Sequence, residues 1–210
     1  MTLIGAMVYE GSVVVASDSM VYDQGLGWKG ETETKLWPIP NNSLIWGYAG
    51  YASLGTWIGQ FLAASNVLET WDAARQAVAM AMARVFSDQR SYWQVARQPE
   101  QANVLPDVLV AGCIGGEPRI MIVDSRLGTE FITEGPAFIG NPLACGKAGI
   151  VIKAFKQERS TLVYGADLLV DVMALVIADT LALGGKPQVW RVTKDGTELL
   201  QAPSAVGNQL

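Results

Sequence analysis

Hydrophobic positions along the chain form short runs rich in β-branched residues, which alternate with longer stretches of helical spacing. The runs at 2–9 and 12–17 predict two strands, joined by a turn at Glu10-Gly11. The second run is almost continuously apolar, so we expect its strand to be covered on both faces. Another pair of strands is predicted over 34–39 and 43–48, with a Pro-Asn-Asn turn between them.

The spacing changes to that of helices in two parts of the chain. Residues 50–64 are rich in Ala and Leu and predict a helix, and Asn66 with Glu69 resembles a capping box ahead of the next one. The apolar positions of that next helix recur at steps of three and four: Trp71, Ala74, Val78, Met82 and Val85. Two further helices are predicted near 143–158 and 165–183, the second ending at a Gly-Gly pair.

The remaining elements indicate how the chain is organised. A polar connection at 87–106 separates the first helix pair from the strands that follow. Five more strands are predicted, at 107–114, 118–124, 129–133, 188–193 and 197–200. Blocks of strands that alternate with helix pairs predict two central sheets with helices outside them. We expect a single domain over 1–200 and a flexible C-terminal tail over 201–210.

Composition excludes several classes of protein. Of the 210 residues 50% are hydrophobic and 17% are charged, which excludes a disordered or low-complexity chain. The net charge is −5 and the 15 basic residues are scattered, so we expect no nucleic-acid partner. The most apolar stretch, 168–183, carries two aspartates and is too short to span a membrane. The start has no signal-peptide pattern and the two cysteines lack metal-ligand spacing, which predicts a cytoplasmic protein.

The chain contains no histidine, and this limits its chemistry most. Ser-His-Asp and Cys-His catalysis are excluded, together with zinc or iron sites that use His. The N-terminus offers an alternative, because Thr2 follows the initiator Met, which is generally removed before a small residue. Thr2 would then carry both a hydroxyl nucleophile and an α-amine with a pKa of about 7.7–8.0, a usable base. Many proteins begin with Met-Thr, so the alternative is a threonine without a catalytic role.

Three more residues suit the same chemistry, and each also has an ordinary structural explanation. Asp18 ends a buried strand and needs a partner there, unless it only caps the next turn. Lys35 begins the following strand; paired with Asp18 it would lower the pKa of the amine, and otherwise it is a strand-edge lysine. Gly50 lies where a strand becomes a helix, so its N–H could stabilise an oxyanion, although a tight turn also uses glycine.

Together these four residues resemble the proteasome β-subunit family and the bacterial heat-shock-locus peptidase, closest in type to the small bacterial proteasome homologues. In that family an Asp follows the catalytic Thr sixteen positions later, as Asp18 follows Thr2. A Lys then opens a strand that leads to Ala-Gly, as Lys35 does here with one extra residue before it. The segments 107–112 and 138–141 are similar to the family's central hairpin and to its Ile-Gly-Ser segment.

The resemblance covers residues 2–195 and implies an α+β fold, a four-layer αββα sandwich of the N-terminal-nucleophile hydrolase type. It implies a threonine-type peptidase or amidohydrolase. Thr2 would attack, Lys35 held by Asp18 would tune the nucleophile, and the Gly50 N–H would bind the oxyanion. No metal or organic cofactor is implied. The expected partners are a polypeptide or peptide substrate and further copies of the chain in stacked rings of six or seven. Such rings imply either a gate or an unfolding ATPase that supplies the substrate.

Several positions depart from the family pattern. Asn141 replaces the serine after Ile-Gly, and the late Asp-x-x-Ser-Gly-Gly motif is one residue longer here, which leaves Asp179 as the supporting carboxylate. Asp179 falls on an apolar helix face, so we expect it to be buried and hydrogen-bonded, unless it only satisfies helix-end groups. Tyr22, Tyr48 and Tyr51 are the predicted substrate-binding residues. The rings of Tyr48 and Tyr51 would narrow the cleft, or else face away into the core.

Two alternative functions remain open at this point. A narrowed cleft favours hydrolysis of one specific small amide or peptide instead of unfolded polypeptides. The altered serine positions favour a catalytically silent, structural ring subunit, although such a subunit has no reason to keep all four of the residues named first.

Overall fold

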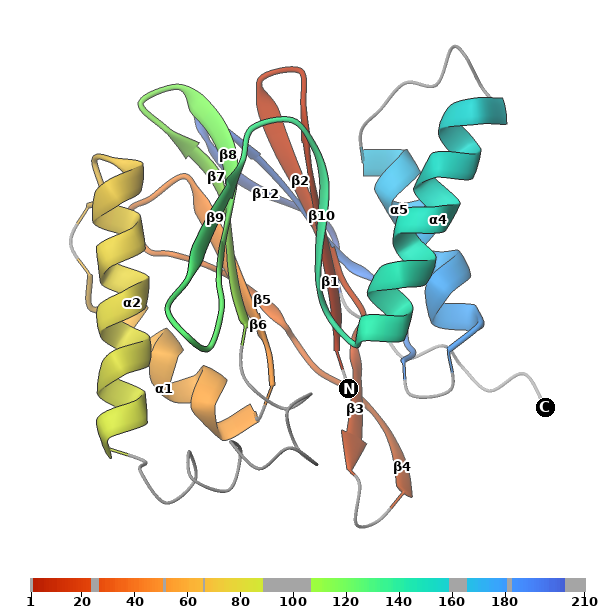
Figure 1. Ribbon diagram of the computed structural model, residues 1–210, viewed down its shortest axis with the longest axis horizontal. Coiled ribbons are helices and arrows are strands. Elements are labelled where there is room, and N and C mark those ends of the chain that lie inside the picture. Colours follow the sequence, from red (N-terminus) through yellow and green to blue (C-terminus); the bar gives the residue numbers. More distant parts are fainter. Residues whose placement is uncertain are drawn as a thin grey trace.

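The computed structural model describes residues 2–23, 27–50, 52–65, 67–88, 107–158, 166–180 and 183–202. Most of its strands belong to two five-stranded sheets (Figure 1). Of the segments expected to lack regular structure, the tail beyond residue 202 and the connection at 89–106 lie outside the described residues.

The first sheet has the strand order β10-β1-β2-β11-β12, and all its neighbouring strands are antiparallel. Its strands are β10 (Gly135–Gly140), β1 (Leu3–Tyr9), β2 (Ser12–Ser17), β11 (Gln188–Thr193) and β12 (Gly196–Gln201). β2 lies at the centre and is buried at every position after its first residue. The strand predicted over 12–17, covered on both faces, is therefore confirmed.

The second sheet has the order β5-β6-β7-β8-β9 and is also antiparallel throughout. Its strands are β5 (Leu36–Pro38), β6 (Leu44–Ala49), β7 (Asp107–Ile114), β8 (Glu117–Val123) and β9 (Thr129–Ile132). A separate hairpin pairs β3 (Met20–Asp23) with β4 (Gly27–Thr32). The apolar pattern did not predict this hairpin or β10, because glycine, proline or charged residues interrupt all three strands.

Two pairs of helices lie on the outer sides of the sheets (Figure 1). They are α1 (Ala52–Ala63) and α2 (Trp71–Asp88) beside the second sheet, and α4 (Pro142–Glu158) and α5 (Ala166–Ala178) beside the first. Each pair buries the apolar stripe of its helices against a sheet, which is the main source of stability for helices of this length. No helix among the described residues is long and apolar enough to cross a membrane.

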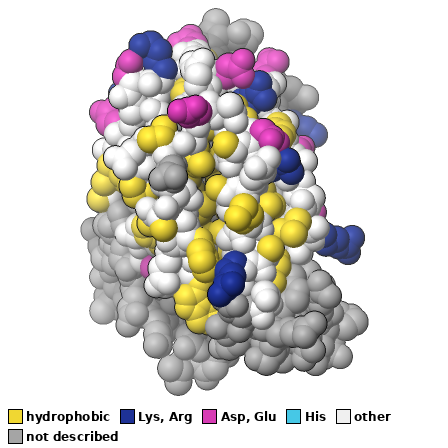
Figure 2. Space-filling view, turned by 90° about the vertical axis from the view of Figure 1, so that its left-hand side faces the viewer, with side chains coloured by type: hydrophobic (Ala, Val, Ile, Leu, Met, Phe, Trp, Pro, Cys, Tyr) yellow, Lys and Arg dark blue, Asp and Glu magenta, His cyan; other side chains and the backbone are white. Residues whose placement is uncertain are grey.

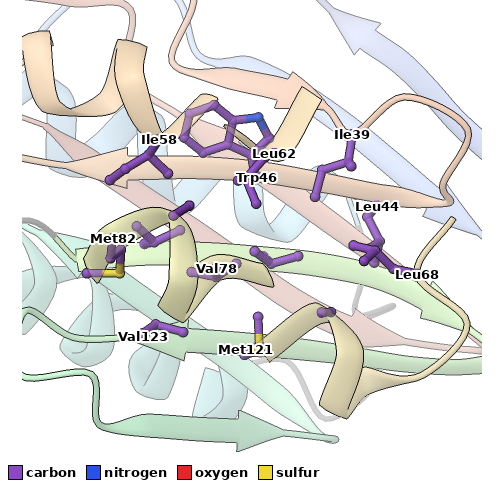
Figure 3. Packing of buried hydrophobic residues seen from close by; sticks show 14 of the residues in the cluster. Ile39, Leu44, Trp46, Ile58, Leu62, Leu68, Val78, Met82, Met121 and Val123 are labelled. Atoms are coloured by element: carbon purple, nitrogen blue, oxygen red, sulfur yellow. The ribbon is translucent and has the colours of Figure 1, made fainter. Parts of the chain in front are cut away.

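The packing of α1 and α2 shows how this burial works. Ile58 of α1 and Val78 and Met82 of α2 lie over Trp46 and Met121 of the second sheet (Figure 3). The outer side of the same helices is mixed in character, since apolar atoms lie among acidic and basic side chains there (Figure 2). The helical spacing of positions 71–85 therefore marks the buried stripe, as predicted.

A third core fills the space between the two sheets. Ile4 and Val15 of the first sheet pack with Ile45 and Leu109 of the second, and all four are fully buried. The sheets approach closely at Gly47 of β6, where an added Cβ would lie 2.8 Å from Ile4 Cδ1. This close approach brings the start of β1 near the start of β5, where the candidate site lies.

The expected fold class, an α+β four-layer αββα sandwich of the N-terminal-nucleophile type, is corrected by these observations. The described residues are mostly antiparallel strands in two five-stranded sheets, with four short helices of 12 to 18 residues. The mismatch is weak, because helices do lie outside both sheets. The sequence overstated the helices, since α1 begins at Ala52 and α5 ends at Ala178, and it understated the strands by missing β3, β4 and β10.

Candidate active site

A buried ion pair links the two sheets at one end. Lys35 Nζ donates to Asp18 Oδ2 at 2.9 Å and to the carbonyl oxygen of Met20 at 2.6 Å. Asp18 is fully buried and Lys35 is 6% exposed. A lone charge would be costly at either position, and here each charge compensates the other. The Asp18–Lys35 pairing expected from the sequence is therefore present, and Lys35 is not a solvated strand-edge lysine.

The Asp18 carboxylate also holds the chain beside Thr2. Its Oδ1 accepts a hydrogen bond from the Leu3 N–H at 2.9 Å, and its Oδ2 accepts one from the Met20 N–H at 3.4 Å. Burial raises the pKa of Asp18, while the charge of Lys35 and the two N–H groups act to lower it. Because Thr2 is bonded directly to Leu3, the ion pair lies beside the residue that is expected to act as the nucleophile.

The backbone of Thr2 is fixed from its other side by the end of β10. Its carbonyl oxygen accepts a hydrogen bond from the Asn141 N–H at 2.9 Å. Gly140 has a φ of 119°, and a Cβ there would lie 2.0 Å from that oxygen, so only glycine fits. Ile4 faces the second sheet, and by alternation Thr2 belongs to the same face, toward the sheet that Lys35 enters.

Gly50 joins β6 to α1, at the junction that the sequence predicted. It is exposed and has a φ of 145°, which favours glycine. α1 begins two residues later, and the first N–H groups of a helix have no partner within it. Gly50 therefore lies at the expected strand-to-helix junction, and its positive φ is also what the alternative explanation, a tight turn that requires glycine, would give.

Asn141 serves as the N-cap of α4. Its Oδ1 accepts hydrogen bonds from the N–H groups of Leu143 at 3.0 Å and Ala144 at 3.1 Å. Pro142 occupies the first helical position, where a missing N–H has no cost. The side-chain oxygen of Asn141 is therefore engaged with the helix, while its backbone N–H holds Thr2.

Asp179 does not lie where the sequence placed it. Its side chain is 77% exposed, and Lys147 of α4 donates to its Oδ2 at 2.7 Å and to its carbonyl oxygen at 2.9 Å. Lys147 holds the pKa of this carboxyl below its usual value. The expected burial is wrong because Leu175, one turn before Asp179 on the same helix face, is itself 51% exposed, and the Asp179 N–H donates to its carbonyl oxygen at 3.2 Å. The alternative, an Asp that serves the end of a helix, describes it better.

The predicted substrate-binding tyrosines are only partly described. Tyr51 and the side chain of Tyr22 lie outside the described residues. The ring of Tyr48 stacks on Trp37 at 5.9 Å and on Trp46 at 6.1 Å, in the core that faces α1. Burial and the nearby Glu33 carboxylate raise the pKa of its hydroxyl. This placement is closer to the core explanation than to a ring that narrows a cleft.

Two residues at the site, Ser19 and Gln188, were not predicted from the sequence as site residues. Ser19 donates from its N–H to the Gly184 carbonyl at 3.1 Å and from its Oγ to the Lys186 carbonyl at 2.8 Å. Gln188, at the start of β11, is 2% exposed and bonds to the backbone of residues 35 and 36. Nothing in the local pattern marks either one, because their partners lie more than 150 positions away along the chain.

No family model matches this chain, and no similar protein was found among curated proteins. The resemblance to proteasome subunits therefore depends only on the residues quoted for it. Within the described part of the chain, no group of three or more His, Cys, Asp or Glu side chains could hold a metal ion.

Proposed function

We propose that this protein is a threonine-type peptidase or amidohydrolase that uses Thr2 as its N-terminal residue. One observation carries the proposal. The Asp18 carboxylate of the buried Lys35–Asp18 pair accepts a hydrogen bond from the N–H of Leu3, which is the residue directly after Thr2. A buried ion pair is weak evidence for stability, because an apolar pair of similar size often serves as well. Placed beside a hydroxyl and an α-amine, the same pair has a chemical use.

The reaction would proceed through an ester intermediate. Thr2 Oγ bonds to the carbonyl carbon of an amide while its proton passes to the α-amine. The C–N bond then breaks, and the leaving amine takes that proton. Water adds to the ester with the α-amine again as base, the acid is released, and Oγ regains its proton.

The other residues would act electrostatically on the nucleophile and on the oxyanion. The Lys35 ammonium would lower the pKa of the Thr2 α-amine and favour a deprotonated Oγ, and Asp18 would keep that ammonium in place. The Gly50 N–H would donate to the oxyanion of the tetrahedral intermediate. Asn141 would contribute through the hydrogen bond from its backbone N–H to the Thr2 carbonyl oxygen. Asp179 would contribute through its ion pair with Lys147 at the end of α5.

The setting of this activity is part of the proposal. Peptides or unfolded polypeptides are the proposed substrates, with copies of the chain in stacked rings of six or seven and an unfolding ATPase to supply them. We place it in the cytoplasm, which the two unpaired cysteines, Cys113 and Cys145, support.

The test begins with the intact mass of the purified protein, which should show that Met1 has been removed. A threonine-directed covalent inhibitor should then add one equivalent of mass to the wild type and none to Thr2→Ala. Thr34→Ala is the matched control, because Thr34 is an exposed threonine next to Lys35. Peptide hydrolysis that persists in Thr2→Ala, or a chain that keeps Met1, would rule the proposal out.

A second candidate, a catalytically silent structural subunit, is favoured by a specific observation. The side-chain oxygen of Asn141 caps α4, and the carboxylate of Asp179 pairs with Lys147, so both supporting positions have structural partners. This candidate predicts no covalent labelling of Thr2 even when Met1 is absent.

A further inference from the structure

Gln188 connects the two sheets at the candidate site through three hydrogen bonds of its buried side-chain amide. Its Oε1 accepts hydrogen bonds from the N–H groups of Lys35 and Leu36, each at 3.1 Å. Its Nε2 donates to the Leu36 carbonyl oxygen at 2.9 Å. A buried amide whose bonds all go to one short segment fixes that segment in both position and orientation.

The segment that Gln188 holds is a weak point of the second sheet. β5 has three residues and lies at the edge, so among the described residues β6 is its only neighbouring strand. The N–H and the carbonyl of Leu36 both face Gln188, which therefore takes the place of a strand on the outer side of β5. Without it, these backbone groups would be left unpaired in a buried region.

Both ends of Lys35 are thus held by the same stretch of the first sheet. Its ammonium is bound by Asp18, the residue after Ser17 at the end of β2. Its backbone is bound by Gln188, which pairs with Ser17 across β2 and β11. The distance between the two attachment points is set by the ladder of the first sheet and not by β5.

We propose that Gln188 is a positioning residue: it fixes the backbone at Lys35 so that the ammonium stays on Asp18 beside Thr2. The catalytic consequence depends on the proposed function, but the placement of Lys35 does not. Loss of the amide would let the start of β5 move away from the first sheet, and Lys35 would lose its geometry with Asp18 while Thr2, Asp18 and Gly50 kept theirs.

The informative variant is Gln188→Met, which keeps the length of the side chain and removes the three hydrogen bonds. Gln201→Met is the matched control, because Gln201 of β12 also bonds to backbone near the start of β11, donating to the Pro187 carbonyl at 2.8 Å, without contacting residues 35 and 36. Should Gln188→Met fail to fold, Gln188→Asn keeps the amide but is one methylene too short to reach its partners.

Two measurements separate this proposal from the proposed function. The first follows the carboxyl ¹³C resonance of Asp18 across pH, which needs no activity. Gln188→Met should shift its titration, and Gln201→Met should leave it as in the wild type. An unchanged Asp18 titration in Gln188→Met, with faster hydrogen exchange at the Lys35 and Leu36 amides, would overturn the proposal. The hydrogen bonds of Gln188 would then be lost without any movement of the Lys35 ammonium.

The second measurement is hydrolysis of a peptide substrate. Gln188→Met should lower kcat at least tenfold with KM within twofold, and should displace the pH profile, because the α-amine loses the influence of Lys35. An equal loss in Gln201→Met would overturn the positioning role. A wild type that shows no hydrolysis contradicts the proposed function alone, and the Asp18 titration still decides whether Gln188 places Lys35.

Discussion

Leu3 and Asp18 exchange two hydrogen bonds. The Leu3 N–H donates to Asp18 Oδ1 at 2.9 Å, and the Asp18 N–H donates to the Leu3 carbonyl at 3.1 Å. The end of β2 is thereby fixed to the start of β1 by both backbone and side chain. If the Asp18 carboxylate moves, Leu3 has to move with it. The positions of the ion pair and of the N-terminal segment are therefore coupled.

Removal of the charge on Asp18 should be strongly destabilising. Asp18→Asn leaves the Lys35 ammonium buried without a counter-charge, and breaking a buried pair in this way costs about 3–5 kcal/mol. Urea unfolding measures the loss. Asp72→Asn is the control, because the Asp72–Arg75 pair lies in solvent and its removal should barely move the urea midpoint. A loss for Asp18→Asn no larger than the control's would show that the pair is dispensable for folding.

The contrast between Asp18 and Asp179 shows what the sequence can and cannot predict at this site. Asp18 was correctly placed because it ends a continuous run of buried β-branched residues, whose period fixes its surroundings. Asp179 was misplaced because Leu175, one turn before it, was assigned to the buried helix face, although that residue is 51% exposed. The partner of Asp179 is Lys147 of α4, and a contact between two helices is not recorded in the spacing within either one.

Among the strands, too, some were predicted from the sequence and others were not. Strands with long apolar runs, such as β2 and β7, were predicted within a residue of their bounds. β10 was missed because two of its residues are glycine and one is proline, and its place beside β1 comes from pairing between distant parts of the chain. Gln188 was predicted as a strand residue, but the hydrogen bonds of its amide to Lys35 and Leu36 were not. They depend on how the two sheets pack, and the local spacing of apolar residues contains no information on that.

Asn141 should affect stability more than catalysis. Asn141→Ala removes the cap of α4 and should cost about 1 kcal/mol of unfolding free energy, whereas Asn141→Asp should retain the cap and favour the helix dipole. Thr70→Ala is the comparison, since Thr70 Oγ1 caps α2 by accepting from the Ala73 N–H at 3.1 Å. Both alanine variants should keep the specific activity of the folded protein. A tenfold loss confined to Asn141→Ala would instead assign its side chain a direct part in the chemistry.

Asp107 should make the stability depend on pH. It begins β7, opposite Ala49 of β6, and burial together with the Asp124 carboxylate raises its pKa to about 6. The folded state thus favours the protonated form. The stabilisation is complete below the usual pKa of 3.8 and is lost as pH rises through about 6.

Asp107→Asn should therefore stabilise the protein at pH 7.5 by about 1–2 kcal/mol, after allowance for its partial exposure, and leave it unchanged at pH 3.5. Thermal unfolding at the two pH values provides the measurement. Asp72→Asn should give no such stabilisation, because Arg75 lowers the pKa of that exposed carboxyl and so favours its charged form in the folded state. A gain of equal size at both pH values would mean that charge on Asp107 is not the cause.

Gly47 should be needed for the two sheets to meet at the site. A Cβ at this position would lie 2.8 Å from Ile4 Cδ1 and from Leu36 Cδ2, and 2.9 Å from the Lys35 carbonyl oxygen. Gly47→Ala therefore has to displace side chains of both sheets and the backbone at Lys35, and overpacking of this kind costs about 1–3 kcal/mol.

Gly146→Ala is the matched control, because Gly146 lies in α4 and a Cβ there meets nothing within 4 Å. Alanine in a helix interior should stabilise by about 0.5–1 kcal/mol relative to glycine, so the two variants should differ in sign when unfolding is measured in urea. Gly47→Ala should also lower peptide hydrolysis by more than its loss of stability explains, because the atom that it displaces belongs to the residue that carries the ammonium. A folded Gly47→Ala with wild-type stability would show that the gap between the sheets is wider than these distances imply.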